Sequence, residues 1–476
     1  MSVRLKNWPL LCGIVAAAGC VHYQPQPLAP GKTAAQFDAR QMDDADLGKF
    51  IATNSGGETK TWPLETWDLN SLTLAAFYFH PDLAVARAQW RVALAGVKTA
   101  GARPNPSVSV APGYDSQIPG NYSPWLVPVT FDLPIETAGK RGKRLIEAEK
   151  LSESARWNFV SAAWQIRGGV RSALLDFATA GQRAELLQKQ FAAQKEITRL
   201  MQGRFDAGEI SHPELTTAQI ALNKTQIDLG DAESKKTEAR SHLAEALGVG
   251  EAALDGQKFD FDFSTRDMTE LTSAEARQVA LRSRADILAA LADYAAAEAE
   301  LQLQIAKQYP DLHLGQGYAW NSGNAGDNQW SLGLTLELPL LDQNQGPIAE
   351  AKANRELSAA KFLQLQAQVS AQVDRAVAGW QSAQAQLKTA GGLLDAAQNQ
   401  QKSIAAQVQS GAAERLDLFS AEIELATVQL AQIDSETQAQ AALGALEDAL
   451  QRPADSISAV IEKICSQNPN AKEAHP

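Results

Sequence analysis

The sequence is poor in cysteine and lacks long apolar runs. It has three cysteines, Cys12, Cys20 and Cys465, too few for a disulfide framework or a cysteine-based zinc site. Beyond the N-terminus there is no run of about 18 or more apolar residues, the length that a membrane-spanning helix needs. These absences exclude a disulfide-stapled scaffold and a helical inner-membrane transporter.

Positive charge is also in deficit. Lysine and arginine number 43 against 55 aspartate and glutamate residues, for a net charge of −12. Because nucleic-acid binding is mostly phosphate neutralisation, we expect no nucleic-acid partner. The six histidines show no ligand spacing, and neither Gly-x-Ser-x-Gly nor His-Glu-x-x-His occurs. We therefore expect no enzyme, no metal site and no cofactor, with a lipid-anchored periplasmic enzyme as a formal alternative.

The N-terminus has the pattern of a bacterial export signal. Arg4 and Lys6 precede an apolar stretch, residues 8–18, that is too short to span a membrane. The Ala-Ala-Gly-Cys run that ends at Cys20 resembles a lipobox, in which Cys20 would be acylated and become the first mature residue. An ordinary signal peptide with an incidental cysteine is the alternative. Val21 stands where an aspartate would retain a lipoprotein at the inner membrane, which favours the outer membrane.

The rest of the chain contains one unit written twice. With 476 residues, 45% of them hydrophobic, the chain can form two or more domains or one long repeated architecture. Trp125 matches Trp330 at an offset of 205, and Gly208 matches Gly411 at an offset of 203. The predicted division is a signal peptide (1–19), an anchored N-terminal segment (20–70), a first repeat (71–248), an equatorial linker (249–274), a second repeat (275–453) and a tail (454–476).

Each copy contains a pair of predicted strands. From Trp330 to Leu338 the apolar residues alternate with polar or small ones, which is the period-two pattern of a strand with one apolar face. The segments 312–320, 108–114 and 125–133 alternate in the same way, and turn-rich loops separate the partners. The sequence therefore predicts one hairpin per copy, with strands of about ten residues.

Long helices are predicted for the remainder of each copy. Residues 135–212 and 348–452 contain no proline, the residue that would break a helix. A helix over about 142–201 would be roughly 90 Å long. The helix after it has a seam of leucines and small residues that begins at Leu215 and, in the second copy, at Leu418. The predicted order in each copy is helix, strand, strand, long helix, tip turn, helix, and the fold class is mainly α.

The predicted strands have the length, the aromatic ends and the apolar face that suit a bilayer crossed by a tilted β-barrel. A soluble sandwich is the alternative, but four strands cannot build one with its own core. Four strands cannot close a barrel either, because the smallest transmembrane barrels have about eight and an open edge inside lipid is not allowed. The chain must therefore oligomerise, and a dimer would close eight strands and a trimer twelve.

Strand-ending Leu-Pro pairs at 133–134 and 338–339, and glycine tips at Gly208 and Gly411 before a leucine seam, complete the doubled unit. On these motifs residues 70–453 resemble the TolC-type outer-membrane efflux proteins. The resemblance implies a homotrimer with a twelve-stranded barrel in the outer membrane and a long α-helical periplasmic tunnel. The tunnel tip would dock onto a periplasmic adaptor (a membrane fusion protein) and an inner-membrane pump of the resistance-nodulation-division type.

The resemblance also implies a function, a passive conduit for metal cations or small organic compounds that the pump expels. The acylated N-terminus matches the lipoprotein branch of the family. The stretch from Glu136 to Arg144 is similar to the strand-to-helix segment of members that serve heavy-metal cation pumps. Two alternatives stay open, a periplasmic coiled-coil adaptor or scaffold lipoprotein and the outer-membrane conduit of a one-step protein secretion system.

The second tip carries the candidate aperture residues. Asp417 lies six residues after Gly411 and matches the family position whose aspartates ring the closed periplasmic aperture. Three copies around an axis would form a cation-attracting constriction. The family's second aspartate is Ser420 here, so Glu414 would share the role. Arg415 would form ion pairs that hold the tip shut, and a solvated arginine is the alternative. The plainer interpretation of Asp417 is an acidic residue in a first helical turn, stabilised by the helix dipole.

Both tips are expected to form the surface that an adaptor grips. The two glycines are predicted left-handed positions at which the chain reverses. The expected docking residues are Gly208, Glu209, Pro213, Glu214, Leu215, Gly411 and Leu418.

A cluster of four cations opens the first long helix, where the helix dipole opposes positive charge. The members of this basic cluster are Lys140, Arg141, Lys143 and Arg144. Compensation must come from outside the helix, and the anionic headgroups of outer-membrane lipids are the predicted partners. A solvated turn is the alternative.

Overall fold

A computed structural model describes residues 23–54, 61–114, 116–117, 124–261, 272–321 and 328–452. The predicted signal peptide, Cys20 and the tail 454–476 with Cys465 lie outside the described residues. Acylation of Cys20 therefore stays a prediction.

The described chain begins with two short helices, after which one order of helices and strands occurs twice. The first helices are α2 (Pro30–Asp38) and α3 (Ala45–Asn54). The first succession is α4 (Leu69–Phe79), α5 (Pro81–Ala100), β1 (Ser107–Val110), β2 (Gly113–Tyr114), β3 (Trp125–Ile135), α6 (Lys140–Asp206) and α7 (His212–Leu247), followed by the short 3₁₀ helix η1 (Glu251–Leu254). The second is α8 (Ser273–Ser283), α9 (Ala285–Ala306), β4 (Leu312–Asn321), β5 (Asn328–Leu336), α10 (Gln345–Gln409) and α11 (Arg415–Leu450).

The helix predicted before each strand pair is two helices. α4 and α5 are separated at His80, whose backbone is extended (φ −69°, ψ 126°), and Pro81 then begins α5 because it cannot continue a preceding helix. α8 and α9 are separated in the same way at Arg284 (φ −65°, ψ 134°), without a proline.

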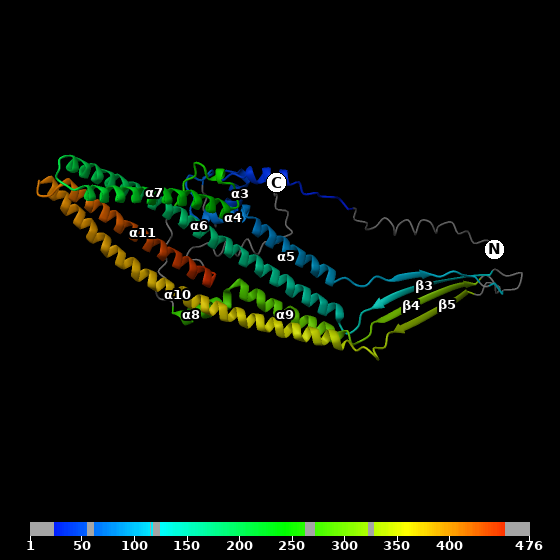
Figure 1. Cartoon of the computed structure of the whole chain (residues 1–476). Helices are drawn as coiled ribbons and strands as arrows, with labels where there is room; N and C mark the ends of the chain where they lie inside the picture. The colour runs from blue at the N-terminus through cyan, green and yellow to red at the C-terminus, as the bar shows by residue number, and fades with distance from the viewer. Residues whose placement is uncertain are drawn as a thin grey trace.

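The molecule is elongated, with the sheet at one end and the two tip turns at the other (Figure 1). α6 has 67 residues and α10 has 65, so each is about 100 Å long. α6 packs against α5 and α9 on the side of the sheet and against α7 and α11 toward the tips. Within the described ranges, no helix combines the length and the apolar character needed to cross a membrane.

The strands of both halves form one antiparallel sheet in the order β1-β3-β4-β5. β3 and β4 are paired from Leu126–Asn321 to Ile135–Leu312, so the two halves of the chain meet in the middle of the sheet. β1 and β2 keep one register against β3 and are separated at Pro112, which has no backbone N–H to donate. The first predicted strand is therefore shorter than expected. Within the described chain, the outer edges of β1 and β5 have no strand partner.

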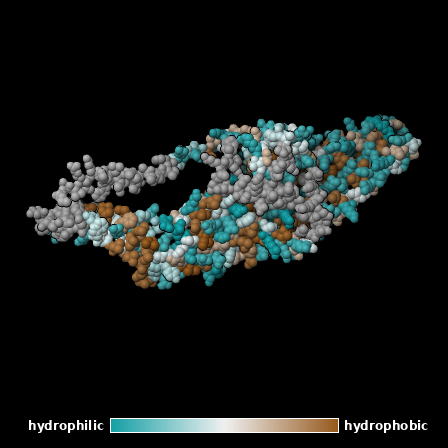
Figure 2. Space-filling view, turned by 180° about the vertical axis from the view of Figure 1, so that it is seen from behind, coloured by the Kyte–Doolittle hydropathy of each residue, from teal (hydrophilic) through white to brown (hydrophobic). Residues whose placement is uncertain are grey.

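One face of the sheet is mostly apolar, with Gln316 as a polar member, and the other is mostly polar or small, with Leu126 as an apolar member. The registers and the alternation of side chains place on the apolar face Val108, Val110, Val127, Val129, Phe131, Leu133, Leu312, Leu314, Leu332, Leu334 and Leu336. The opposite face carries Ser107, Ser109, Thr130, Asp132, His313, Gly315, Gly317, Ser331, Gly333 and Thr335. The apolar side chains are not covered within one chain, since Leu332 is 77% exposed. Figure 2 shows hydrophobic residues gathered at this end of the molecule.

Two arginines close the ends of helices near the middle of the molecule. Arg40, between α2 and α3, donates to the carbonyl oxygens of Phe79 (3.0 Å) and Gly248 (2.5 Å), where α4 and α7 end. Arg284 donates to the carbonyl of Ala449 (2.8 Å) near the end of α11. A cation that binds the last carbonyls of a helix stabilises its C-terminus. The N-terminal segment is thus part of the first half of the fold.

Candidate functional site

The two tip turns reverse the chain through glycine. Gly208 has φ +78° and Gly411 has φ +77°, so the predicted left-handed backbone is confirmed at both. After α6, the N–H of Glu209 donates to the carbonyl of Arg204 (2.8 Å), which is the outer bond of a Schellman motif. The corresponding bond at the end of α10 runs from the N–H of Ala412 to the carbonyl of Gln407 (2.8 Å).

The first tip is organised by a capping box. Oε2 of Glu214 accepts from the backbone N–H of Ser211 (2.6 Å) and from its hydroxyl (2.7 Å), and these bonds hold the pKa of Glu214 below its usual value. Leu215 is only 4% exposed and packs inside the tip. Glu209 and Pro213 are exposed. Among the expected docking residues, Leu215 packs in the interior of the tip and leaves little surface for a partner to contact.

The second tip has a capping box of its own. Oδ2 of Asp417 accepts the backbone N–H of Glu414 (2.9 Å), so Asp417 stabilises the first turn of α11. Asp417 is exposed, Leu418 is half-buried, and Ser420 donates to the carbonyl of Leu416 within the helix (2.9 Å). Asp417 therefore acts as an acidic residue that stabilises a first helical turn, which was the plainer interpretation, and its place in an aperture stays a prediction.

An ion pair joins the two tips. A guanidinium nitrogen of Arg204, in the last turn of α6, contacts the carboxylate of Glu414 at the start of α11. A pocket of about 280 Å³ lies beside this pair, between the two tips. Arg415 instead places its guanidinium over the ring of Phe419, with its Cζ atom 5.8 Å from the ring centroid, which is within the range of a cation–π contact. Within the described part of one chain, the ion pair between the tips is made by Arg204, and the role expected for Arg415 stays a prediction.

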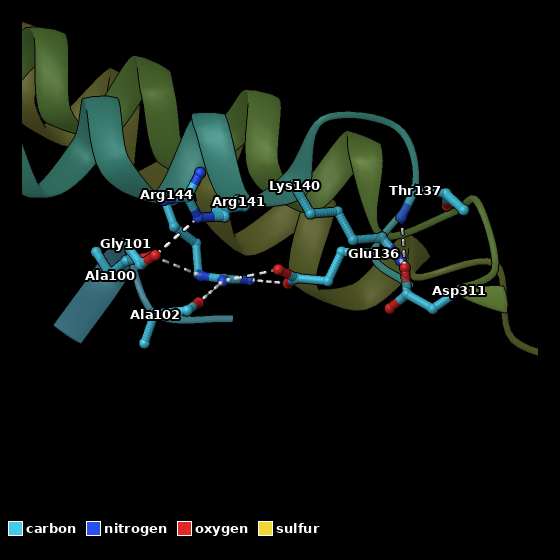
Figure 3. Close-up of polar contacts among 9 residues, drawn as sticks. All are labelled: Ala100, Gly101, Ala102, Glu136, Thr137, Lys140, Arg141, Arg144 and Asp311. Atoms are coloured by element: carbon cyan, nitrogen blue, oxygen red, sulfur yellow. Dashed lines mark hydrogen bonds and ion pairs between the residues drawn. The ribbon is translucent and has the colours of Figure 1, made fainter. Parts of the chain in front are cut away.

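The basic cluster lies at the junction between the sheet and the helices (Figure 3). Lys140 is buried, and its ammonium group binds Oδ1 of Asp311 at 2.8 Å. The N–H of Thr137 donates to the same oxygen (2.9 Å). Burial by itself raises the pKa of Asp311, but these two bonds outweigh it and hold the pKa below its usual value.

Two arginines of the cluster bind the end of α5. Arg141 donates to the carbonyl of Gly101 (2.7 Å), and Arg144 donates to that of Ala102 (3.3 Å) and to the carboxylate of Glu136 (Figure 3). Three members of the basic cluster thus have protein groups as partners, and the predicted contact with lipid headgroups stays a prediction. These protein contacts join the sheet, α5 and α6 at the junction.

Lys143 differs from the other members of the basic cluster. It is half-buried, and the described part of the chain supplies no ion pair to it. Its side chain is therefore free of the protein ion pairs that engage Lys140 and Arg144 in the described ranges.

The polar face of the sheet contains a histidine–carboxylate pair. Nδ1 of His313 on β4 lies 2.9 Å from Oδ2 of Asp132 on β3. Elsewhere in the described ranges, no group of three or more histidine, cysteine, aspartate or glutamate side chains is arranged to hold a metal ion.

A buried charged cluster between α6 and α11 was not predicted. Arg167, Arg171 and Glu447 are 0%, 5% and 1% exposed. The sequence does carry a signal for it, since Arg167 and Arg171 are four residues apart and therefore on one face of an otherwise apolar stretch of helix. Their partner lies 276 or more positions away, which local patterns do not reveal.

Long paired helices that carry an antiparallel sheet at one end, with one apolar face and unpaired edges, have the architecture of outer-membrane channels with a helical extension. The family model described as outer membrane efflux protein matches residues 77–249 and 276–451. The chain belongs to the outer membrane efflux protein family.

Individual relatives agree with this assignment. The chain is 25% identical over 222 residues to the cobalt-zinc-cadmium resistance protein CzcC of Cupriavidus metallidurans, a match that covers 46% of this chain and 52% of that protein. The match thus spans only about half the length of that relative. The outer-membrane channel OprN has a TM-score of 0.65 at 22% identity, covering 80% of this chain and 89% of that one. The outer membrane protein VceC of Vibrio cholerae has a TM-score of 0.67 at 20% identity, covering 81% and 97%.

Proposed function

We propose that this protein is the outer-membrane channel of a tripartite efflux system, a passive conduit for cargo that an inner-membrane pump expels through a periplasmic adaptor. The observation that carries the proposal is the sheet at one end of the long helices, in which β1 and β2 share one of four strand positions. Its apolar face is exposed, and its two outer edges have no strand partner in the described ranges. An apolar sheet face of this kind is stable in lipid, where its backbone groups must all be paired.

The open edges require more than one copy. Closing β1 of one chain against β5 of the next would pair both edges, and three chains would give a twelve-stranded barrel. The apolar face would then meet lipid, and the face with Asp132 and His313 would line the lumen. The helices would continue the wall as a periplasmic tunnel that ends at the tip turns.

The tips are the proposed docking surface for the adaptor. Exposed backbone at Gly208 and Gly411, with Glu209 and Pro213 beside it, lies at the end of the molecule farthest from the sheet. In the closed state three copies of Asp417 would face the axis and form a cation-selective constriction. The pump would be of the resistance-nodulation-division type.

Metal cations are the proposed cargo. This rests on the likeness to CzcC, whose name refers to cobalt, zinc and cadmium. A conduit needs a wall that a hydrated cation can pass, and not a tight ligand cage, because strong binding would slow release. Acylation of Cys20 would add a lipid anchor at the outer membrane, beside the barrel.

Assembly and transport test the proposal separately. Purified protein should run in detergent as a heat-modifiable trimer of about 150 kDa, three times roughly 50 kDa. A stable monomer with intact strands would contradict the barrel. Cells that lack the gene should accumulate more cobalt, zinc or cadmium, and the wild-type gene should restore export. If the trimer forms but metal accumulation is unchanged in cells that lack the gene, the channel assignment stands and the proposal of a metal cargo is contradicted.

A further inference from the structure

The histidine–carboxylate pair on the polar face of the sheet has a defined hydrogen bond. Nδ1 of His313 lies 2.9 Å from Oδ2 of Asp132. An ionised carboxylate can only accept hydrogen bonds, so Nδ1 carries the proton of this contact and donates it. The lone pair of the neutral ring is then on Nε2, and no hydrogen bond or ion pair to Nε2 occurs in the described part of the chain. Asp132 thus holds the histidine in the tautomer that presents Nε2 as a ligand atom.

Metal-binding histidines share this arrangement. Such a histidine binds the metal through one ring nitrogen and donates the N–H of the other to a carboxylate or carbonyl, which orients the ring and raises its basicity. Among the described histidines, only His313 has a ring nitrogen within hydrogen-bond distance of a carboxylate, since the nearest such contacts of His80 and His242 are 3.9 Å and 3.6 Å long. His212 has its Nδ1 3.2 Å from the hydroxyl of Thr216. His313 is therefore the described histidine that is oriented to bind a metal.

The surface around the pair is open. The side chains of His313 and Asp132 are 41% and 40% exposed. Gly315 lies opposite Asp132 on β4, and Gly333 lies opposite Gly315 on β5. Because these two positions carry no side chain, a hydrated ion can reach the imidazole from the polar side of the sheet.

The ligand set at this place is small. Asp311, two residues before His313, is bound by the ammonium group of Lys140 at 2.8 Å. Within the described ranges, no third histidine, cysteine, aspartate or glutamate side chain completes a metal-binding group. Water must fill the other positions around an ion, so binding is weak and the ion exchanges readily. Imidazole nitrogen selects transition-metal cations such as zinc, whereas magnesium and calcium prefer oxygen ligands.

The pair lies at the end of the sheet that adjoins the long helices (Figure 1). β4 begins at Leu312, directly before His313, and β3 ends at Ile135, shortly after Asp132. In the barrel proposed above, the polar face lines the lumen, and three chains would place three such pairs where the tunnel opens into the barrel. An ion that leaves the tunnel would pass them.

We propose that His313, oriented by Asp132, is a weak and rapidly exchanging binding site for divalent transition-metal cations on the lumen wall. The inference rests on the proposed function, because it gives the cargo of that channel a contact with the wall at the entrance to the barrel. The imidazole favours such a cargo over magnesium and calcium ions, and the incomplete ligand set lets the cargo leave.

Zinc titration of the full-length protein in detergent tests the site. Histidine is isotopically labelled at Cε1 for NMR, and the signal of His313 is assigned by its loss in His313→Gln. We expect Zn²⁺ to shift this signal at a concentration about tenfold or more below that needed for His212, an exposed histidine whose Nδ1 has a hydroxyl and not a carboxylate beside it. The same concentrations of Mg²⁺ should shift neither signal.

Asp132→Asn is the matched variant, because its amide oxygen can still accept the N–H of His313 while the negative charge is lost. It should raise the Zn²⁺ concentration at which the signal of His313 is half shifted by about 10–100-fold and leave that of His212 unchanged. The site is overturned if Asp132→Asn responds to Zn²⁺ as the wild type does. It is also overturned if His313 and His212 of the wild type respond at the same Zn²⁺ concentration, a comparison that stands even if Asp132→Asn does not fold.

The titration and the accumulation assay in cells can fail separately. If the wild-type gene restores metal export but Zn²⁺ shows no preference for His313, the proposed function stands and this site is rejected. If Zn²⁺ binds at His313 as expected but cells that lack the gene accumulate no more metal, the site stands and the metal cargo is rejected.

Discussion

Arg204 and Glu414 form an ion pair that joins the end of α6 to the start of α11, so a charged contact links the two tips of one chain. The two residues are 210 positions apart in the sequence. Because the tips are at the end of the molecule that would open, this contact opposes their separation.

Replacing Arg204 by alanine should release the second tip from the first. Both side chains are more than a third exposed, so we expect a stability cost of only about 0.2–1 kcal/mol. In a planar bilayer the proposed channel should show a larger conductance than the wild type, because the closed state loses a contact that the open state lacks. Lys189→Ala, which removes a pair with Glu185 within α6, is the control and should leave conductance unchanged. Equal conductance in wild type and Arg204→Ala would show that the pair does not hold the tip.

Asp417 has two separable roles, a cap and a proposed charge at the aperture. Asp417→Asn keeps an oxygen that can accept the N–H of Glu414 and removes the negative charge, whereas Asp417→Ala removes both. We expect both variants to reduce cation selectivity and block by multivalent cations. Only Asp417→Ala should lose the hydrogen bond to Glu414, at a cost of about 0.5–1.5 kcal/mol of stability. Glu209→Ala on the first tip should change neither property.

The two variants of Asp417 also separate the interpretations. If both leave selectivity and block unchanged while Asp417→Ala alone lowers the unfolding temperature, Asp417 is a capping residue only. The family likeness would then hold for the fold but not for the aperture.

Periodic patterns predicted the elements of this fold, because they depend on neighbours in the sequence. The alternation from Trp330 onward predicted a strand, and the absence of proline predicted long helices. In the structure these helices, α6 and α10, have 67 and 65 residues. Gly208 and Gly411 marked the tips, since a left-handed backbone at a helix end favours glycine. The interruption of the first strand had a local signal in Pro112, which the alternation alone did not take into account.

Charge partners could not be predicted in the same way. In the sequence the positive charges of the basic cluster have no visible partner. Asp311 lies 171 positions from Lys140, and the backbone carbonyls at the end of α5 are not distinguished by any residue type. Arg204 and Arg40 find their partners through tertiary packing for the same reason. Local patterns report which face of an element is buried, and not which distant group meets it there.

Lys140 should be required for the junction below the sheet. Lys140→Met removes the cation from the buried contact with Asp311, and we expect a loss of about 1.5–3 kcal/mol, the range for hydrogen bonds to charged groups. Lys143→Met, three residues along the same helix, should cost little. Urea unfolding of both variants measures the difference. Equal stability of Lys140→Met and the wild type would show that the contact does not hold the junction.

The pH dependence of the same contact has a defined sign. The pKa of Asp311 is lowered in the fold, so the ionised carboxylate stabilises it, and this contribution is present above the usual aspartate value and lost as pH falls below it. We expect the wild type to lose stability relative to Asp311→Asn in acid, below about pH 4. A constant difference between the two proteins from pH 7 to pH 3 would contradict the assignment.

The two faces of the sheet should respond in opposite ways to a new charge. Leu334 and Thr335 are neighbours on β5, both exposed in one chain, but they lie on the apolar and the polar face. If the apolar face meets lipid, Leu334→Arg places a charge in the bilayer at a cost of about 2–4 kcal/mol near its midplane, and the yield of heat-modifiable trimer in the outer membrane should fall. Thr335→Arg would place the same charge in a water-filled lumen and should insert normally. Equal insertion of the two variants, or the reverse order, would mean that the sheet does not present its apolar face to lipid.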